Sequence, residues 1–204
     1  MNTEEVVQDQ FKSELRRKSF HLLVLILPLS VNILHEEPRT RTALIIGGAF
    51  LTGFLLVIEA LRLQKPSFFA NRFAREVERE KIAAYIATYF AGYFIFLSYG
   101  LKIAAISIFV SALGDAAAAL IGIRYGSHLL PFTKKKSLEG AAAGFSVTLL
   151  VCLLYAKFWL ALTVALIMVA TDFIEEPNTF FISDNFLNPY FFAILFYLAP
   201  HWLR

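Results

Sequence analysis

The apolar residues of the chain fall into seven runs, which charged or polar stretches of unequal length separate. The runs cover residues 19–34, 43–61, 82–99, 101–123, 138–156, 158–174 and 189–203. A helix needs about 20 apolar residues to cross a hydrocarbon core about 30 Å thick, and the shorter runs can borrow flanking residues. The pattern therefore predicts an all-α, polytopic integral membrane protein with about seven transmembrane helices, and six or eight crossings also fit it.

Two polar segments carry apolar residues at a spacing of four, which is typical of helices that lie on a membrane surface. In residues 1–18 basic residues surround the spaced positions, so we predict an amphipathic N-terminal helix. In residues 62–81 the same spacing predicts a cytoplasmic interfacial loop whose helix borders a lipid entrance, and a solvated connector fits equally well. The spaced residues are Val7, Phe11 and Leu15 in the first segment and Phe69, Phe73 and Val77 in the second.

The composition supports a membrane protein of one domain. Of the 204 residues, 58% are apolar and 21 are Phe, which is too apolar for a soluble core of this size. The length indicates a single domain, residues 1–204. Cys152 is the only cysteine and lies in an apolar run, which excludes a disulfide framework and predicts a packing role. The charged start lacks a small-residue cleavage site, so no cleaved signal peptide is expected.

The basic residues indicate how the chain is oriented. Fourteen of the 19 Lys and Arg residues lie in residues 1–18, 62–81 and 124–137, which seven crossings place on one side of the membrane. Basic residues accumulate on the cytoplasmic side, so we predict a cytoplasmic N-terminus and, with seven spans, an external C-terminus. The membrane is then a bacterial or archaeal plasma membrane or an ER-type membrane.

Ionisable residues within or next to the runs gather toward this cytoplasmic side. They are His21, Glu59, Asp115, Glu139 and Asp172. A charge at membrane depth is costly and usually has a function. The structural alternatives are that Asp115 is the partner of a lysine or a backbone donor, and that Glu59 pairs with Arg62 one turn away. Lys18 fits a basic residue that reaches to the membrane interface.

The stretch from Gly114 to Gly144 concentrates the candidate chemistry. It reads GDAAAALIGIRYGSHLLPFTKKKSLEGAAAG and joins a carboxylate in an apolar run to a loop with three lysines. Carboxylates hold Mg²⁺, cations neutralise phosphate oxygens, and a helix that begins near Glu139 has a dipole that favours phosphate. As alternatives, the lysines fit a topology signal and the small residues fit close helix packing. No Gly-x4-Gly-Lys-Ser/Thr or Gly-x-Gly-x-x-Gly motif occurs, which excludes the soluble nucleotide-binding folds.

An acidic segment precedes the last apolar run. Asp172, Glu175 and Glu176 lead to Asp184-Asn185, and an acidic loop beside a basic face is suited to supply metal ligands. The structural alternative is a solvated loop in which Asp184-Asn185 turns into a helix whose first turn holds Pro189. Both interpretations place the polar stretch 183–189 at the cytoplasmic end of the last span.

Five short motifs occur in one order along residues 15–192, and together they resemble the CTP-dependent lipid kinases: dolichol kinase, phytol kinase and the CTP-dependent diacylglycerol kinase of yeast. Each motif alone is weak, whereas five in this order form a specific signal. They are Arg-Lys-x-x-His (Arg17, Lys18, His21), Glu-x-x-Arg (Glu59, Arg62), Gly-Asp-x-x-Ala…Gly…Tyr-Gly (Gly114, Asp115, Ala118, Gly122, Tyr125, Gly126), Lys-x-Lys-Ser-Leu-Glu-Gly (Lys134 to Gly140) and an acid followed by Asp-Asn-x-x-x-Pro (Glu175 or Glu176, then Asp184, Asn185 and Pro189).

The resemblance implies a transmembrane catalytic domain that transfers a phosphoryl group from CTP to the hydroxyl of a membrane lipid alcohol, with Mg²⁺. Diacylglycerol and an isoprenoid alcohol of the polyprenol or phytol type both fit, and CTP rather than ATP follows from the resemblance alone. Asp115 would bind Mg²⁺ or act as the general base. The predicted roles are catalysis by Asp115, Lys136 and Glu139; nucleotide binding by Arg17, His21, Lys134, Lys136, Ser137 and Asn185; metal binding by Asp115, Glu139 and Asp184; and contact with the lipid head region by His21, Glu59 and Glu175.

Two other functions fit parts of the sequence. The Gly-Asp and Lys-Ser-x-Glu-Gly elements are also similar to the phosphatidate cytidylyltransferases, but their C-terminal His-Gly-Gly and Asp-Arg elements are replaced here by residues 182–189. A small transporter would place polar groups near the midplane, often with internal repeats, and the sequence has neither. The expected partners are a lipid alcohol, a nucleoside triphosphate and membrane lipids, not nucleic acid, and a homo-oligomer is compatible with the sequence.

Overall fold

The computed structural model describes residues 37–65, 84–131, 136–173 and 184–203, together with positions 8, 11, 12, 14, 15, 18, 19 and 67. For residues 84, 85, 87, 88, 172, 184 and 185 it describes the backbone only. The helices in these ranges are α3 (Pro38–Gln64), α4 (Ala84–Tyr99), α5 (Leu101–Tyr125), α6 (Leu138–Leu153), α7 (Phe158–Asp172), α8 (Asp184–Leu198) and the 3-10 helix η5 (Pro200–Trp202). This part of the chain has isolated β-bridges but no strand, which confirms the all-α prediction for it.

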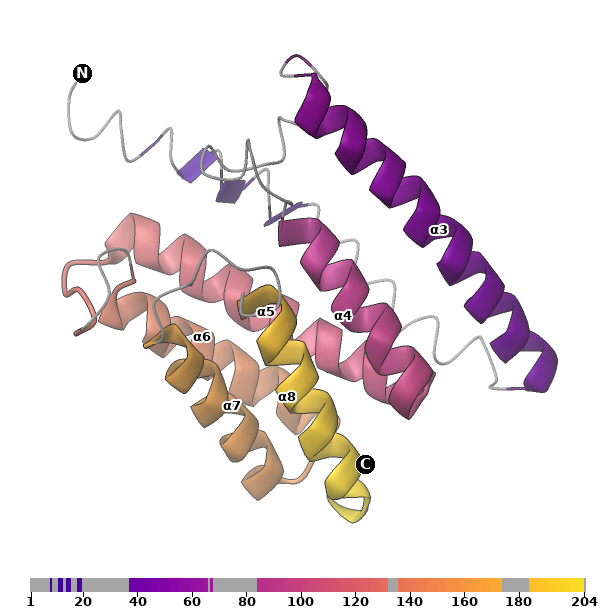
Figure 1. Ribbon diagram of the computed structural model, residues 1–204. Helices are drawn as coiled ribbons and strands as arrows, with labels where there is room; N and C mark the ends of the chain where they lie inside the picture. The colour runs from indigo at the N-terminus through magenta and orange to yellow at the C-terminus, as the bar shows by residue number, and fades with distance from the viewer. Residues whose placement is uncertain are drawn as a thin grey trace.

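Helices α5 to α8 form the body of the molecule, with α4 at one side of it and α3 beyond α4 (Figure 1). One apolar core joins α5, α6, α7 and α8 and includes Val110, Phe192 and Cys152, whose packing role is thereby confirmed. A second core joins α4, α5 and α8 and includes Ile95 and Ile108. Helices α5 and α8 contribute to both cores, and α5 also makes the most extensive helix contact, with α6, so it is the central helix of the fold.

Helix α3 buries one acid–base pair and exposes most of its apolar residues. Within this helix, all of which the structure describes, only Glu59 and Arg62 are buried. A helix in water would do the opposite, so this arrangement fits a helix that faces lipid and keeps this ion pair inside the protein. The large exposed side chains are Ile45, Ile46, Phe50, Leu51, Phe54, Leu56, Val57 and Leu63.

Two tyrosines of α4 attach α3 to the body. The hydroxyl of Tyr89 donates a hydrogen bond to the carbonyl oxygen of Gly48 over 2.7 Å, and that of Tyr93 donates to the carbonyl oxygen of Ile45 over 2.8 Å. The ring of Tyr93 lies so close to Gly48 that a Cβ there would overlap it. The contact therefore uses mainly the backbone of α3 and one glycine, with Thr52 Oγ1 lying 3.4 Å from the hydroxyl of Tyr89 and Leu44 packed against the second core.

Six of the seven predicted apolar runs coincide with helices α3 to α8, and the first, residues 19–34, lies outside the described residues. Among the described helices, α3 and α5 are long and apolar enough to cross a membrane. The other four have 15 or 16 residues and are about 23 Å long, which is shorter than a hydrocarbon core of about 30 Å. Seven crossings, the amphipathic helix at 1–18 and the interfacial loop 62–81 therefore stay predictions.

Helix α8 begins five residues before the predicted run. Its first residue is Asp184, so Asp184 and Asn185 belong to the first turn and Pro189 is the sixth residue. The alternative of a turn at Asp184-Asn185, with Pro189 in the first helical turn, is therefore wrong by about one turn. Proline lacks an N–H, so only the carbonyl of Asn185 loses its helical hydrogen bond, and the helix continues through the proline.

Small residues let α5 and α6 approach closely. A Cβ added at Gly140 would lie 2.7 Å from the carbonyl oxygen of Ala118, and one added at Gly144 would lie 3.3 Å from that of Gly114. This confirms the packing role predicted for the small residues. It also fixes the start of α6 beside the end of α5. The small residues recur every four positions: Gly114, Ala118 and Gly122 on α5, and Gly140, Gly144 and Thr148 on α6.

We expect Gly140→Ala to destabilise the protein, because the added methyl group pushes α6 away from the backbone of α5. Overpacking of this kind costs about 1–3 kcal/mol of unfolding free energy. Thermal unfolding in detergent micelles measures the effect. Gly53→Ala is the matched control, since no atom lies within 4 Å of a Cβ there. A Gly140→Ala variant as stable as the wild type would contradict the close contact.

Candidate functional site

Asp115 forms an ion pair with Lys18, which lies 97 positions earlier in the chain. The ammonium group of Lys18 donates a hydrogen bond to Asp115 Oδ2. The Lys18 side chain is 2% exposed and that of Asp115 is 19% exposed, so the pair is largely shielded from solvent. The interpretation of Lys18 as a residue that reaches to the membrane interface is therefore wrong, because its ammonium is buried and binds the partly buried carboxylate of Asp115 instead of water.

The Lys18–Asp115 pair is compatible with a structural role and with a chemical one. It matches the structural alternative for Asp115, in which a lysine compensates the charge. Burying two charges stabilises a protein little by itself, since desolvation offsets most of their attraction. A carboxylate kept beside an ammonium in a candidate membrane-spanning helix is also what metal or phosphate chemistry requires.

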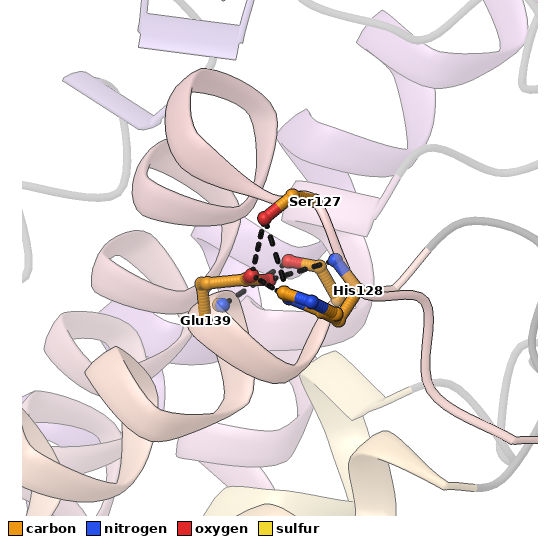
Figure 2. Close-up of polar contacts among 5 residues, drawn as sticks. Ser127, His128 and Glu139 are labelled. Atoms are coloured by element: carbon orange, nitrogen blue, oxygen red, sulfur yellow. Dashed lines mark hydrogen bonds and ion pairs between the residues drawn. The ribbon is translucent and has the colours of Figure 1, made fainter.

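Glu139 lies in the first turn of α6 and binds two residues that follow α5 (Figure 2). Ser127 Oγ donates to Glu139 Oε1 over 2.7 Å, and His128 Nδ1 lies 2.7 Å from the same oxygen. The backbone N–H of His128 donates to Glu139 Oε2 over 3.3 Å. We call Ser127, His128 and Glu139 the Glu139 cluster. Sequence analysis missed Ser127 and His128, because nothing in their spacing links them to Glu139.

Backbone hydrogen bonds hold the loop 126–137, which links α5 to α6. The N–H of Leu130 donates to the carbonyl oxygen of Lys136 over 2.9 Å, and the N–H of Leu138 donates to that of His128 over 2.8 Å. These bonds draw the two ends of the loop together. Lys136 is thereby placed beside the start of α6.

Ser137 has a structural task at the start of α6. Its Oγ accepts a hydrogen bond from the N–H of Gly140 over 3.1 Å and so caps the helix. The side chain is buried against Gly122 and Gly126, where an added Cβ would lie 3.2 Å and 2.5 Å from Ser137 Oγ. The predicted contact of Ser137 with a nucleotide stays a prediction.

The structure does not bring Asp115 and Glu139 together. Ser137, two residues before Glu139, packs against Gly122, which follows Asp115 by seven residues. Seven residues of helix span roughly 10 Å. The carboxylate of Glu139 bonds instead to Ser127 and His128, beyond the end of α5, and a metal ion shared with Asp115 stays a prediction. Within the described ranges, no group of three or more His, Cys, Asp or Glu residues is placed to hold a metal ion.

Glu59 and Arg62 form an ion pair with two hydrogen bonds inside α3. Arg62 Nε donates to Glu59 Oε2 over 2.8 Å, and Arg62 Nη2 donates to Oε1 over 2.6 Å. Both residues are buried. The structural alternative, in which the two residues pair with each other, is confirmed. Contact of Glu59 with a lipid head group stays a prediction.

Asn188 is a buried polar residue to which sequence analysis gave no role. It lies on α8, one turn after Asp184, and is 1% exposed. Its Nδ2 donates to the sulfur of Met168 over 3.3 Å, and among the described residues its Oδ1 has no hydrogen-bond partner. An unpaired buried oxygen is costly, which makes Asn188 a further candidate for the site. Its one sequence signal is its place in the polar stretch 183–189.

The remaining predicted site residues cannot be placed by their side chains. Asp184 and Asn185 open α8 and are described by their backbone. Arg17, His21, Lys134 and Glu175 lie outside the described residues. The predicted roles of these six residues stay predictions.

The chain is similar to a curated protein, CTP-dependent diacylglycerol kinase 1 of Eremothecium gossypii, with 27% identity over 156 residues. The alignment covers 72% of this chain and 48% of that protein, so the chain spans about half the length of the relative it matches. The match confirms the resemblance to the CTP-dependent lipid kinases. No protein-family model matches the chain, and no solved structure matches it.

Removing one member of the Glu59–Arg62 pair should destabilise the protein more than removing both charges. Arg62→Met takes the guanidinium from a buried carboxylate, which costs about 3–5 kcal/mol, whereas Glu59→Gln combined with Arg62→Met leaves neither charge. We expect the double variant to unfold at a higher temperature than Arg62→Met alone. Thermal unfolding in lipid nanodiscs measures the difference, and a double variant less stable than either single variant would contradict the pairing.

Proposed function

We propose that the protein is a CTP-dependent kinase that phosphorylates the hydroxyl of a membrane lipid alcohol at the cytoplasmic membrane face. The alcohol is diacylglycerol or an isoprenoid alcohol of the polyprenol or phytol type. The observation that carries the proposal is the Lys18–Asp115 pair. It joins a carboxylate in the central apolar helix to an ammonium in the segment before the first predicted span. Similarity to a CTP-dependent diacylglycerol kinase supports the type of reaction.

Asp115 is the proposed proton acceptor. The lipid hydroxyl oxygen forms a bond to the γ-phosphorus of CTP while the bond from that phosphorus to the β–γ bridging oxygen breaks, and CDP leaves. The proton of the hydroxyl passes to the Asp115 carboxylate, which Lys18 orients. Asp115 lies ten residues before the end of α5, about 15 Å along the helix. A substrate that stays in the bilayer can reach this depth more easily than one in water.

Mg²⁺ is the proposed cofactor, and Asp115 and Asp184 are the residues proposed to hold it. When bound, the ion would compensate the negative charge of the phosphate oxygens. Mg²⁺ is usually held by one or two carboxylates together with substrate phosphates, so a cluster of three acids is not required. Metal binding and proton acceptance are alternative tasks for Asp115. Glu139 fits the metal less well, because Ser127 and His128 bond to its carboxylate.

The phosphates of CTP are proposed to bind where α5 ends and α6 begins. The lysines of the loop 126–137 would supply positive charge, with Lys134 and Lys136 holding phosphate oxygens, and the start of α6 adds the positive end of a helix dipole. From this end the phosphate chain would extend inward along α5 toward Asp115. The residues proposed to bind the nucleotide are Arg17, His21, Lys134, Lys136, Ser137 and Asn185.

The lipid is proposed to enter from the bilayer, with its head region near the cytoplasmic ends of the helices. The exposed apolar side chains of α3 suit contact with hydrocarbon tails. His21, Glu59 and Glu175 are the residues proposed to contact the lipid head region. Diacylglycerol is the acceptor that the name of the relative indicates for that protein.

Product analysis tests the reaction. Purified protein in lipid nanodiscs should convert radiolabelled CTP and a lipid alcohol into CDP and a lipid phosphate. The alcohols are diacylglycerol, dolichol and phytol, each offered with CTP and with ATP. Release of pyrophosphate and formation of a CDP-lipid from phosphatidate would identify a cytidylyltransferase instead. No transfer to any of the alcohols would refute the proposal.

Asp115→Asn should lower kcat for lipid phosphorylation by about 10²-fold or more, the usual loss when one electrostatic contact to a transition state is removed. The single change also leaves Lys18 without this carboxylate, so Lys18→Met combined with Asp115→Asn removes both charges and should restore stability. We expect this double variant to be folded and inactive. Kinase activity and thermal unfolding are measured on the same preparations.

The outcome of the double variant separates the two roles of the pair. A stable double variant with wild-type activity would assign the Lys18–Asp115 pair to structure alone. Glu37→Gln is the control, because Glu37 is an exposed acid that precedes α3, and we expect it to keep wild-type activity.

A further inference from the structure

His128 is exposed to solvent and yet held in one orientation. Its side chain is 76% exposed, but Nδ1 lies 2.7 Å from Glu139 Oε1. Its backbone is fixed as well, since the N–H donates to Glu139 Oε2 and the carbonyl oxygen accepts from the N–H of Leu138. Ordering an exposed side chain costs conformational entropy that burial does not offset here. Such an arrangement fits a side chain whose free edge binds a ligand.

The contacts of the ring determine which of its atoms is available. The carboxylate of Glu139 only accepts hydrogen bonds, so the Nδ1 that faces it carries a proton. The second nitrogen, Nε2, lies on the other edge of the imidazole ring, so it does not face Glu139. When both nitrogens are protonated, the ring donates one hydrogen bond to Glu139 and offers the other to an anion.

The charges near His128 in the sequence suit a polyanion. Four basic residues lie within residues 124–136, and Glu139 is the one acid in the sequence between Asp115 and Asp172. A bare carboxylate in the first turn of α6 would repel a phosphate chain that approached the helix start. Ser127 and His128 hydrogen-bond to the Glu139 carboxylate, and the His128 ring then directs Nε2 away from that carboxylate. The basic residues are Arg124, Lys134, Lys135 and Lys136.

We propose that His128 binds the phosphate chain of the nucleoside triphosphate through Nε2, and that Glu139 is a positioning residue that orients the His128 ring. The inference rests on the proposed function and deepens it. It adds a phosphate-binding residue that none of the five motifs contains, and it replaces the metal-binding role predicted for Glu139 with an indirect one.

Two substitutions of His128 separate the inner and outer edges of the ring. The amide nitrogen of Asn occupies a position close to Nδ1, so His128→Asn can keep the contact with Glu139 but has no outer donor. The longer side chain of Gln places its amide nitrogen close to Nε2, so His128→Gln can keep the outer donor. We expect His128→Asn to raise the KM for CTP about tenfold or more, as for loss of a hydrogen bond to a charged group.

The same measurements distinguish nucleotide binding from a general loss of structure. We expect the KM for the lipid to be unchanged in His128→Asn, and His128→Gln to recover part of the CTP affinity. Glu139→Gln should raise the KM for CTP by a smaller factor, because it loosens the ring without removing it. Equilibrium binding of radiolabelled CTP to the purified protein, without lipid, should follow the same order.

His201→Asn is the matched control. His201 is an exposed histidine of η5. The carbonyl oxygen of its neighbour Trp202 accepts a hydrogen bond from the N–H of Lys157. Lys157 follows the C-terminal end of α6, whereas Glu139 lies at the N-terminal end, so His201 is remote from the Glu139 cluster. We expect wild-type values of both KM constants for this variant.

The results separate this inference from the proposed function. If the wild type phosphorylates a lipid and His128→Asn has the wild-type KM for CTP, the inference about His128 is overturned while the function stands. If Glu139→Gln lowers kcat about 10²-fold at unchanged KM, as for a lost transition-state contact, Glu139 is not a positioning residue. If no lipid is phosphorylated but CTP binding depends on His128, the phosphate site stands and the kinase proposal fails.

Discussion

Small residues at intervals of four bring the backbones of α5 and α6 so close that neither helix can slide along the other without a clash. This contact determines the position of every candidate residue on the two helices. It places Asp115 deep along α5 and the first turn of α6 beside the end of α5. Backbone hydrogen bonds join residues 128 and 130 to residues 136 and 138 at this end and depend on the same register. The close packing at glycine and alanine therefore keeps the Asp115 carboxylate deep along α5 and the Glu139 cluster at the end of the helix.

Each described charged group near the candidate site has a partner of the opposite sign or a set of hydrogen bonds. Lys18 compensates Asp115, Arg62 compensates Glu59, and Ser127 and His128 bond to Glu139. In an apolar protein such partners are expected, since an uncompensated charge there is expensive. For an enzyme they have a further meaning, because a substrate or ion has to replace or extend them. Binding of a nucleotide would then be an exchange of ionic partners, with little unpaired charge at any stage.

The sequence predicts the local features well. Apolar runs locate the helices, because the signal for a helix in lipid is contained in consecutive residues. Glu59 and Arg62 pair because a spacing of three residues in a helix brings their side chains to one face. The spacing of the small residues of α5 and α6 likewise predicts close packing. In each of these cases the information lies within a few turns of one or two neighbouring helices.

Contacts between distant segments are not predictable in this way. Lys18 meets Asp115 across 97 positions, and no spacing indicates which of the basic residues would do so. Asp115 and Glu139 are only 24 positions apart in the sequence, yet the register of α5 and α6 separates them. The sequence does not indicate His128 or Asn188, because their interest depends on the folded structure. His128 contacts a carboxylate on the next helix, and Asn188 has a buried amide oxygen without a partner among the described residues.

The attachment of α3 has a consequence for how this helix can change. Tyr89 and Tyr93 bond to carbonyl oxygens of α3, and every amino acid provides a carbonyl oxygen. Apart from Gly48, which leaves room for the ring of Tyr93, Thr52, whose hydroxyl lies 3.4 Å from that of Tyr89, and Leu44, which packs against the second core, this junction makes little demand on the identity of the α3 side chains. The outward surface of the helix is therefore free to drift and to follow the thickness and lipid composition of the membrane. Homologous proteins could exchange this helix as a cassette, provided that the two tyrosines, the glycine and the internal acid–base pair are kept.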